Sequence, residues 1–287
     1  MQLLRRLLLG EAKPTGGLAP SPEPPSVHIR SKIEVGWATD VGKTRDHNED
    51  TALVITAAHD GDDMRPSFGL FVLADGMGGH RAGELASSLA ARVAAYHIAR
   101  HVYLPSLIDR EHDLSQPALT EILVDAIQAA NDAVSKQVPG GGTTLTCALV
   151  LGTQAYIGHV GDSRAYVLTE ERLEQITHDH SLVGRLIESG QLTRDEAAVH
   201  PQKHVLYRAV GQSGPLEVDA HVRKIPLGDH LLLCSDGLWE MVDDAVIIDL
   251  ITGASSRQEA CEGLIAAANE AGGRDNTTAI LWRCPLG

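Results

Sequence analysis

Apolar residues along the chain form short runs separated by turn residues, together with longer stretches of helical spacing. The runs at 33–40, 51–58 and 68–75 are rich in β-branched and apolar residues and end in turn signals, so each predicts a strand. The same features predict further strands at 143–152, 154–162, 164–170, 230–237 and 276–284.

Helical spacing of apolar residues marks two long segments and two shorter ones. The Ala-rich stretch from Gly83 to Tyr103 and the stretch from Pro117 to Val138 predict long helices. Two more helices are predicted near 243–251 and 256–271, and residues 179–200 predict helical turns outside the sheets. Strands in runs and helices in pairs favour an α+β fold, with antiparallel sheets and helices on their outer faces, over a doubly wound sheet.

The N-terminal segment lacks this patterning. Residues 11–30 are dominated by proline and glycine, so residues 1–31 are expected to be a flexible tail before a folded domain at 32–287. Arg5 and Arg6 interrupt the leucine run of MQLLRRLLLG, which disfavours a secretory signal and leaves a weak membrane-surface contact as the alternative to a tail. No apolar stretch is long enough to span a bilayer, so we expect a cytoplasmic protein.

Composition narrows the classes of function. The net charge of −14 argues against nucleic-acid binding through a basic surface. Such a charge serves solubility, or it reflects acidic residues gathered around a cation. No C-x-x-C pair is present, so the cysteines are interpreted as buried thiols in a reducing compartment rather than a disulfide framework or a zinc site. They are Cys147, Cys234, Cys261 and Cys284.

Carboxylates stand at the ends of three predicted strands. Asp75 and Asp236 each end an apolar strand and precede a glycine, and Asp275 precedes the last strand. A strand fixes its terminal side chain, and the glycine allows a sharp turn that exposes a carbonyl. Mg²⁺ and Mn²⁺ prefer such oxygen ligands. Asp-Gly is also an ordinary turn signal, but the three sites and the acidic cluster RDHNED at 45–50 together favour a cation site, because converging carboxylates repel one another unless a cation holds them.

Arg45 begins that acidic cluster. Its guanidinium fork suits bidentate recognition of two phosphate oxygens. An arginine just before Asp46, Glu49 and Asp50 is equally an ion-pair partner, so both roles stay open when the arginine is considered alone. Beside a pair of dications the phosphate role is favoured.

Six motifs follow one another along the chain: RDHNED (45–50), VLADGMGGHR (72–81), GTTLT (142–146), HVGDSRAYV (159–167), CSDGLWEM (234–241) and GRDNTTA (273–279). Their order and spacing, over about residues 33–283, resemble the protein phosphatase 2C family of metal-dependent phosphatases. DGMGGH and GDSRAY resemble its bacterial branch. The resemblance implies a four-layer α-β-β-α sandwich, with two central antiparallel sheets flanked by pairs of helices.

The resemblance also implies a principal set of metal ligands. Asp75 would bridge two metals, and Gly76 would give its backbone carbonyl to one of them. Asp236 and Asp275 would hold the other. The metals of the family are Mn²⁺ or Mg²⁺, two per site.

Three further residues take outer roles by the same resemblance. Glu49 and Asp50 would sit at the second metal and ligate through water. Asp162 would bind a third and weaker metal together with Asp236. Arg45 would bind the phosphate.

The implied reaction is direct hydrolysis of phosphoserine or phosphothreonine. Two cations about 3.5–4 Å apart would share one water and aim the bridging hydroxide at phosphorus, with no phosphoenzyme intermediate. Arg45 and the metals would neutralise charge on the phosphoryl oxygens. The leaving alkoxide needs a proton. Met77 stands where eukaryotic relatives carry a histidine, so His80 and a water on the third metal are the alternative donors.

Residues 179–203 correspond to the flap that lies beside the active site in this family, and we expect it to select substrates. Four histidines lie in or beside it: His178, His180, His200 and His204. Their spacing offers no ligand pair on one helix face, which disfavours a histidine metal site.

Two other functions stay open. The same fold can serve as a catalytically silent phosphoprotein-binding module, although such members usually lose metal-binding aspartates that this chain keeps. A small-phosphoester hydrolase is the other, although no P-loop or Rossmann glycine pattern is present. A purely structural acidic protein would leave the ordered motifs unexplained. The expected partners of a monomeric enzyme are phosphorylated proteins, including a Ser/Thr kinase and its substrates.

Overall fold

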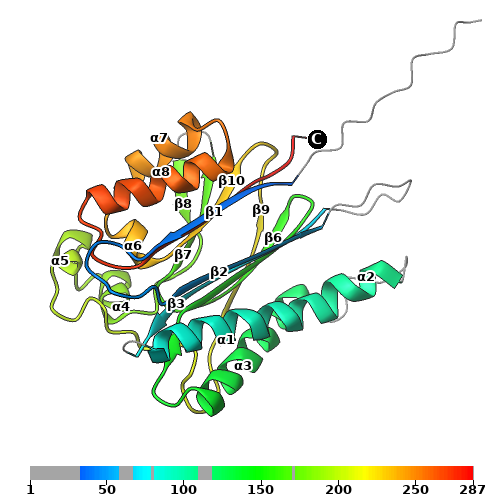
Figure 1. Cartoon of the computed structure of the whole chain (residues 1–287), viewed down its shortest axis with the longest axis horizontal. Coiled ribbons are helices and arrows are strands. Elements are labelled where there is room, and N and C mark those ends of the chain that lie inside the picture. The colour runs from blue at the N-terminus through cyan, green and yellow to red at the C-terminus, as the bar shows by residue number, and fades with distance from the viewer. Residues whose placement is uncertain (1–32, 58–66, 79–80, 109–117, 170–171, 287) are drawn as a thin grey trace, which may run out of the picture. The chain divides into compact units, whose positions relative to one another are not determined.

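The computed structural model of the protein describes residues 33–57, 67–78, 81–108, 118–169 and 172–286. They belong to one compact unit of the chain, Ser31–Gly287. Two antiparallel sheets lie face to face at its centre, with helices α1 and α3 on one outer face and α7 and α8 on the other (Figure 1). The expected four-layer α+β sandwich is confirmed.

The first sheet has the strand order β1-β11-β10-β7-β8 and is antiparallel throughout. Its strands are β1 (Glu34–Asp40), β7 (Arg164–Thr169), β8 (Arg172–Gln175), β10 (His230–Cys234) and β11 (Thr277–Arg283). β1 pairs with β11, with Asp40 opposite Thr277, so strands from the two ends of the domain lie side by side.

The second sheet has the strand order β2-β3-β5-β6-β9, and the short β4 pairs with the end of β3. Its strands are β2 (Asp50–Ala57), β3 (Phe68–Met77), β4 (Gly142–Thr143), β5 (Leu145–Leu151), β6 (Gln154–Val160) and β9 (Asp219–Lys224). β2 and β3 pair so that Asp50 lies opposite Asp75. This register brings two carboxylates together at one end of the sheet.

Two pairs of helices cover the sheets. On one side lie α1 (Arg81–Ile98), which continues through the π-helix η1 (Ala99–Tyr103) into α2 (Leu104–Ile108), and α3 (Leu119–Gln137). On the other lie α7 (Asp244–Gly253) and α8 (Arg257–Glu270). The short helices α4 (Leu182–Glu188), α5 (Arg194–Ala198) and α6 (Asp236–Trp239) lie at one end of the sandwich (Figure 1). Within the described residues, no helix is both long and apolar enough to cross a membrane.

Side chains of the strands alternate between the layers. In β3, Leu70 and Val72 pack against the α1 and α3 side, while Phe71 and Leu73 pack between the two sheets. Ile280 and Trp282 of β11 enter the same inter-sheet layer. Burying a Leu, Ile or Phe side chain contributes about 1.5–3 kcal/mol. The apolar layers beneath the helices and between the sheets therefore fix how the sheets dock.

The expected elements are present with a few differences. The strand expected at 230–237 ends at Cys234, because the chain turns there into helix α6. Ser235 is the N-cap of this helix, which begins at Asp236. Strands β8 and β9 were not expected, since both are short and mostly polar. The expected tail, residues 1–31, lies outside the described residues.

Candidate metal centre

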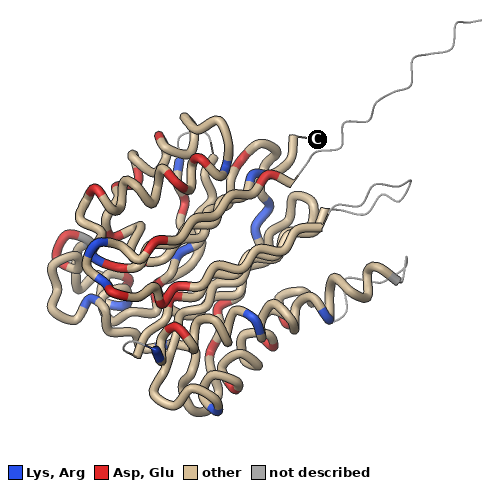
Figure 2. The backbone as a smooth tube through the Cα atoms, viewed as in Figure 1, with Lys and Arg blue, Asp and Glu red and all other residues tan. Residues whose placement is uncertain are grey.

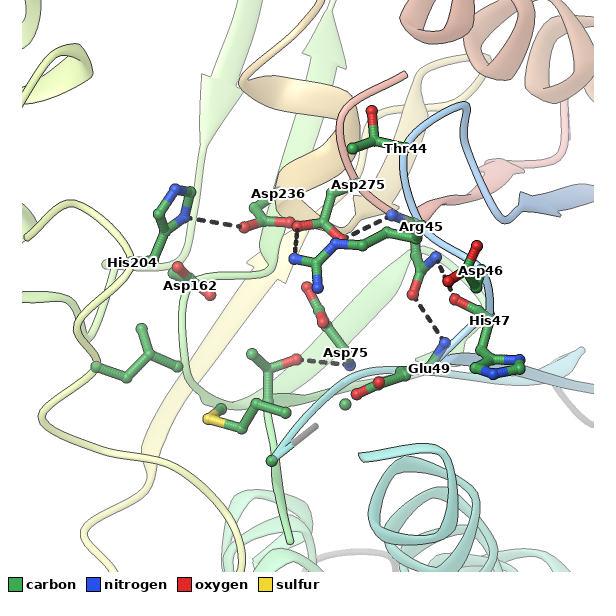
Figure 3. A pocket seen from close by; sticks show the side chains of 16 residues that line it. Thr44, Arg45, Asp46, His47, Glu49, Asp75, Asp162, His204, Asp236 and Asp275 are labelled. Atoms are coloured by element: carbon green, nitrogen blue, oxygen red, sulfur yellow. Dashed lines mark hydrogen bonds and ion pairs between the residues drawn. The ribbon is translucent and has the colours of Figure 1, made fainter. Parts of the chain in front are cut away.

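A cavity of about 520 Å³ opens at the end of the sandwich where strands of both sheets finish (Figure 3). Its lining includes Arg45, Glu49, Asp75, Gly76, Asp162, Asp236 and Asp275, which are all the expected site residues except Asp50. Acidic segments of the chain gather at this end of the molecule (Figure 2). The sequence-based prediction therefore names residues that the fold brings into one place.

β3 positions Asp75 and Gly76 at the floor of the cavity. The Asp75 backbone N–H donates to Thr144 Oγ1 at 2.9 Å, and its carbonyl accepts from the Thr144 N–H and the Thr143 hydroxyl, both at 2.8 Å. Thr144 is itself fixed by the Ser163 hydroxyl at 2.8 Å. The backbone beneath the Asp75 carboxylate is thus held from two sides.

Asp50 lies behind the cavity and joins the two sheets. It begins β2 of one sheet, and its Oδ2 accepts the hydroxyls of Ser235 at 2.8 Å and Thr278 at 2.6 Å from the other sheet. Its Oδ1 is buried and has no hydrogen-bond donor in the part of the chain that the structure describes. One oxygen of this carboxylate is therefore anchored, and the other is free for a ligand.

Asp236 and Asp275 lie beside strands of the first sheet, Asp236 after β10 and Asp275 before β11. Asp236 opens α6 directly after β10, and Gly237 is required there because a Cβ would lie 2.1 Å from the Asn276 carbonyl oxygen. Asp275 accepts its own neighbour's N–H, that of Asn276, on Oδ1 and the Arg45 guanidinium on Oδ2 at 2.6 Å. The Arg45 side chain is 54% exposed at the cavity mouth.

Glu49 fits a gap that two glycines leave. A Cβ on Gly83, in the first turn of α1, would lie 1.8 Å from Glu49 Oε2, and one on Gly76 would lie 2.6 Å from the Glu49 carbonyl oxygen. The Gly76 N–H donates to that same carbonyl at 3.2 Å. α1, the end of β3 and the loop before β2 therefore meet in close contact around the Glu49 carboxylate.

Asn276 holds the loop that carries Arg45 and Glu49. Its Oδ1 accepts the Glu49 backbone N–H at 2.8 Å, and its Nδ2 donates to the Val41 and His47 carbonyls, both at 2.9 Å. Asn276, Gly83, Ser235 and Thr278 were not predicted as site residues. Ser235, Asn276 and Thr278 lie inside the motifs given above, close to the aspartates, and Gly83 follows one motif by two residues. Their closeness in sequence to the predicted ligands is the signal that could have identified them.

Burial and mutual repulsion dominate the electrostatics of the carboxylate cluster. Burial raises the pKa of Asp75 and of Asp236 well above the usual range, and the neighbouring carboxylates raise it further. Burial likewise raises the pKa of Asp50 to about 6 and that of Asp162 to about 7. Of the neighbouring charges, Asp162 acts most strongly on Asp236, so these two carboxylates are close partners.

This donor set fits hard divalent cations. All the side-chain donors are oxygens, they belong to partly or fully buried residues, and Asp50 Oδ1 has no hydrogen-bond partner among the described residues. Mg²⁺ and Mn²⁺ prefer carboxylates and carbonyls, and their charge would relieve the repulsion that raises the pKa values. The cysteines of the described residues do not offer an alternative metal site, because they are free and buried. Burial raises the pKa of Cys147 and of Cys234 to about 12, which disfavours the thiolate form that binds metals.

One imidazole reaches the cavity from the flap. His204 lines it, with Nδ1 4.0 Å from Asp236 Oδ2, and its side chain is 60% exposed (Figure 3). Met77 also lines the cavity, as its place in the motif predicts. His80, considered from the sequence as a proton donor, lies outside the described residues.

Comparison with known proteins places these features in a family. The family profile described as Protein phosphatase 2C matches residues 56–268. The chain is 37% identical, over 85% of its length and 93% of the relative's, to the serine/threonine phosphatase stp of Listeria innocua.

Two solved structures show the same fold. The Mycobacterium tuberculosis serine/threonine phosphatase PstP/Ppp is 33% identical with a TM-score of 0.73, covering 88% of this chain and 99% of that one. The catalytic domain of PstP in complex with two manganese ions is 32% identical with a TM-score of 0.69, at the same coverage.

Proposed function

The chain belongs to the protein phosphatase 2C family and is a protein serine/threonine phosphatase, and from this premise we propose that it hydrolyses phosphoserine and phosphothreonine with two divalent cations held in the cavity. The main support is that carboxylates from both sheets converge in one cavity. Burial and their mutual repulsion raise the pKa values of Asp75 and Asp236. The two manganese ions of the similar PstP structure support Mn²⁺ as an occupant, with Mg²⁺ as the alternative.

The residues divide between two cation positions. Asp75 would bridge them, with the Gly76 carbonyl at one and Asp236 with Asp275 at the other. Asp50 and Glu49 would hold the waters of the second position, because Asp50 has one anchored and one free oxygen. When bound, the paired cations would activate the attacking water and draw charge from the phosphoryl oxygens.

Asp162 and Asp236 would together hold a third cation. Both are carboxylates on the flap side of the cavity, and each is buried enough for its pKa to be raised. The Asp162 carbonyl accepts the Trp239 indole N–H at 3.1 Å, which fixes the loop that carries it.

Arg45 would bind the phosphate. Its guanidinium stands half-exposed at the mouth and contacts Asp275 through Nη2. The other donors of the fork can meet two phosphate oxygens as charge builds on them. The ion-pair and phosphate roles weighed from the sequence are thus compatible, since Asp275 would orient the guanidinium.

His204 is the group we assign to protonate the leaving oxygen. It stands on the flap side of the cavity, beside Asp236. A serine or threonine alkoxide leaves poorly without a proton, whereas p-nitrophenolate leaves readily. His204→Gln should therefore lower kcat strongly on a phosphothreonine peptide and only slightly on p-nitrophenyl phosphate. Equal losses on both substrates would remove His204 from this role.

The substrates would be phosphorylated proteins, including those of a partner Ser/Thr kinase and the kinase itself. The free, buried cysteines of the described residues suit a reducing compartment, so we propose a cytoplasmic enzyme.

The decisive experiment measures phosphate release from a phosphothreonine peptide with and without Mn²⁺. We expect release only with Mn²⁺, and its loss in Asp236→Asn; Asp249→Asn, on α7 away from the cavity, serves as control. Tight peptide binding with no release under Mn²⁺ would instead support a silent binding module. Turnover of p-nitrophenyl phosphate with inert phosphopeptides would support a small-phosphoester hydrolase.

A further inference from the structure

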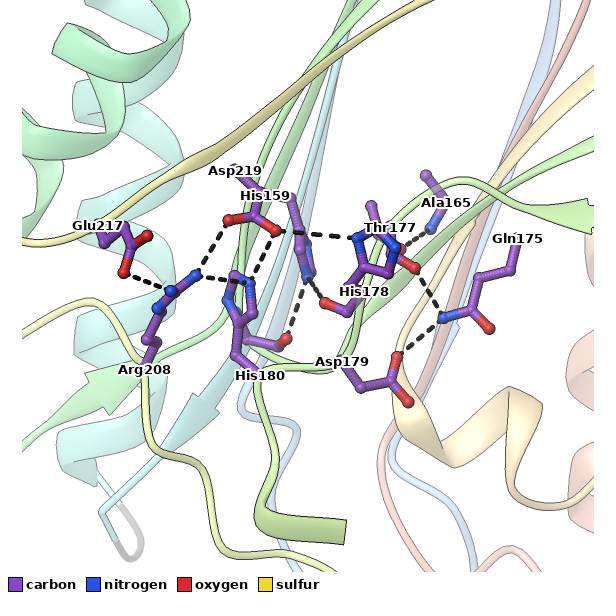
Figure 4. Close-up of polar contacts among 11 residues, drawn as sticks. His159, Ala165, Gln175, Thr177, His178, Asp179, His180, Arg208, Glu217 and Asp219 are labelled. Carbon is purple, nitrogen blue, oxygen red and sulfur yellow. Dashed lines mark hydrogen bonds and ion pairs between the residues drawn. The ribbon is translucent and has the colours of Figure 1, made fainter. Parts of the chain in front are cut away.

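A second group of ligand-type side chains lies outside the cavity, at the edge strand β9. Asp219 and His221 are two residues apart on that strand, so both side chains leave the same face. His178 faces them from the loop between β8 and α4, with Nδ1 4.0 Å from Asp219 Oδ2. One ligand atom from each of the three lies within 4.8 Å of the others. Figure 4 shows His178 and Asp219 turned toward one another.

Asp219 is held in place by two neighbours. Gly161 N–H donates to His180 Nδ1 at 3.1 Å, so a neutral His180 carries its proton on Nε2 and donates it to Asp219 Oδ2 at 3.2 Å. Arg208 Nη1 donates to Asp219 Oδ1 at 3.0 Å (Figure 4). A carboxylate oriented in this way by outer hydrogen bonds is typical of a metal ligand.

The two histidines are ready to bind. His221 Nε2 is buried and has no hydrogen-bond partner among residues 33–57, 67–78, 81–108, 118–169 and 172–286, which is a costly state for an imidazole nitrogen. The His178 side chain is 62% exposed, lies beside the His221 ring, and makes no hydrogen bond through its ring nitrogens to the described residues.

We propose that His178, Asp219 and His221 form a binding site for a borderline transition-metal ion of the Zn²⁺ class, distinct from the catalytic cations. Two imidazoles and one carboxylate match three-protein-ligand zinc sites, in which water takes the fourth position. The nitrogen donors disfavour Mg²⁺, which prefers oxygen ligands. Ligand distances of about 2.0–2.2 Å require the three side chains to close by roughly 1 Å, which the exposed His178 can supply.

An ion at this position would fasten the start of the flap to the second sheet. His180 N–H donates to the Gly161 carbonyl at 2.7 Å, and the His178 carbonyl lies 3.1 Å from the ring nitrogen Nε2 of the buried His159. These contacts connect residues 178–180 with the loop that carries Asp162. The site would therefore stabilise the flap side of the cavity without touching the catalytic cations, and its existence does not depend on the proposed reaction.

The site can be tested with Zn²⁺ alone as the probe. The intact chain is saturated with Mg²⁺, titrated with Zn²⁺, and compared with His178→Ala and with His200→Ala, a half-buried flap histidine outside the cluster. We expect the wild type and His200→Ala each to bind one equivalent of Zn²⁺ with similar affinity. His178→Ala should bind this equivalent at least 10-fold more weakly. Zn²⁺ that enters the catalytic cavity would appear equally in all three proteins.

Thermal melts and Co²⁺ spectra separate metal binding at this site from an effect of the substitution on folding. Thermal melts without Zn²⁺ should coincide for the wild type and His178→Ala, and added Zn²⁺ should raise the Tm of the wild type and of His200→Ala only. Co²⁺ should give a stronger visible absorption band in the wild type than in His221→Gln, since four-coordinate nitrogen-containing sites absorb more strongly than six-coordinate oxygen sites. Identical Zn²⁺ titrations of the wild type and His178→Ala would overturn the proposal, as would a wild type that binds no such ion.

Discussion

Replacing Gly83 with alanine would test how the cavity holds Glu49. The added Cβ would lie 1.8 Å from Glu49 Oε2, whereas ordinary contact begins near 3.4 Å. The carboxylate would have to move by roughly 1.6 Å, the difference between these distances, while metal–ligand distances tolerate only about ±0.2 Å. The substitution therefore displaces one group from the second cation position and leaves every charge in place.

The expected size of the effect follows from that displacement. Disturbing a group that orients a metal or its waters typically costs about 10- to 100-fold in metal affinity. Alanine is also favoured over glycine within a helix by up to about 1 kcal/mol, so α1 itself is not weakened. Gly83→Ala should thus need at least 10-fold more Mn²⁺ for half-maximal activity.

The assay is Mn²⁺ activation of phosphate release from a phosphothreonine peptide. Gly263→Ala is the matched control, because it is a helical glycine of α8 whose Cβ would meet Leu250 at 3.5 Å without a clash. The control should keep the Mn²⁺ requirement of the wild type and melt at the same temperature or slightly higher. If Gly83→Ala is folded and shows an unchanged Mn²⁺ requirement, Glu49 does not act at the metal.

Three more outcomes are expected. In EDTA, Asp162→Asn should stabilise the protein more at pH 7 than at pH 5, by at most about 1.4 kcal/mol per pH unit in urea melts. The native Asp162, with its pKa raised from 3.8 to about 7, keeps a proton that the unfolded chain has lost, so stability falls as pH rises through this window; equal gains at both pH values would contradict this. Asn276→Ala removes three hydrogen bonds and should cost about 3 kcal/mol of unfolding free energy and lower kcat/KM, whereas an unchanged kcat/KM would show that the loop of Arg45 needs no such support. Cys147 and Cys234 should react with a thiol reagent only on unfolding, since burial raises each pKa to about 12; rapid native labelling at either position would refute their burial.

The sequence allowed most of the fold to be predicted because most of its strands are strongly apolar. FGLFVLAD and NTTAILWRC are buried on both faces, so their runs stand out. DAHVRK of β9 forms an edge strand that is largely exposed and polar, and it was not predicted. The flap histidines offer no ligand pair at helical spacing. Asp219 and His221 lie two residues apart, a spacing that brings side chains together only on a strand, so no signal in the sequence indicated the proposed site there.

Aspartates that line the cavity could be picked out singly from the sequence, but the residues that hold them in place could not. Asp75 and Asp236 carry a local signal, an apolar run followed by glycine. The contact between Asp50 and Ser235 crosses from one sheet to the other, and that between Glu49 and Gly83 crosses from a loop to a helix. Such contacts depend on how the layers dock, which no local pattern encodes.

The pairing of β1 with β11 has a consequence for biosynthesis. β1 lies at the sheet edge and has no partner in its own sheet until β11 is made, and Asp275 stands just before that strand. A chain still attached to the ribosome before this point can close neither the first sheet nor the cation site. Long-range pairings of this kind also slow folding. Phosphatase activity should therefore arise only after synthesis of the domain is complete, and nascent chains should be inactive toward phosphoproteins near the ribosome.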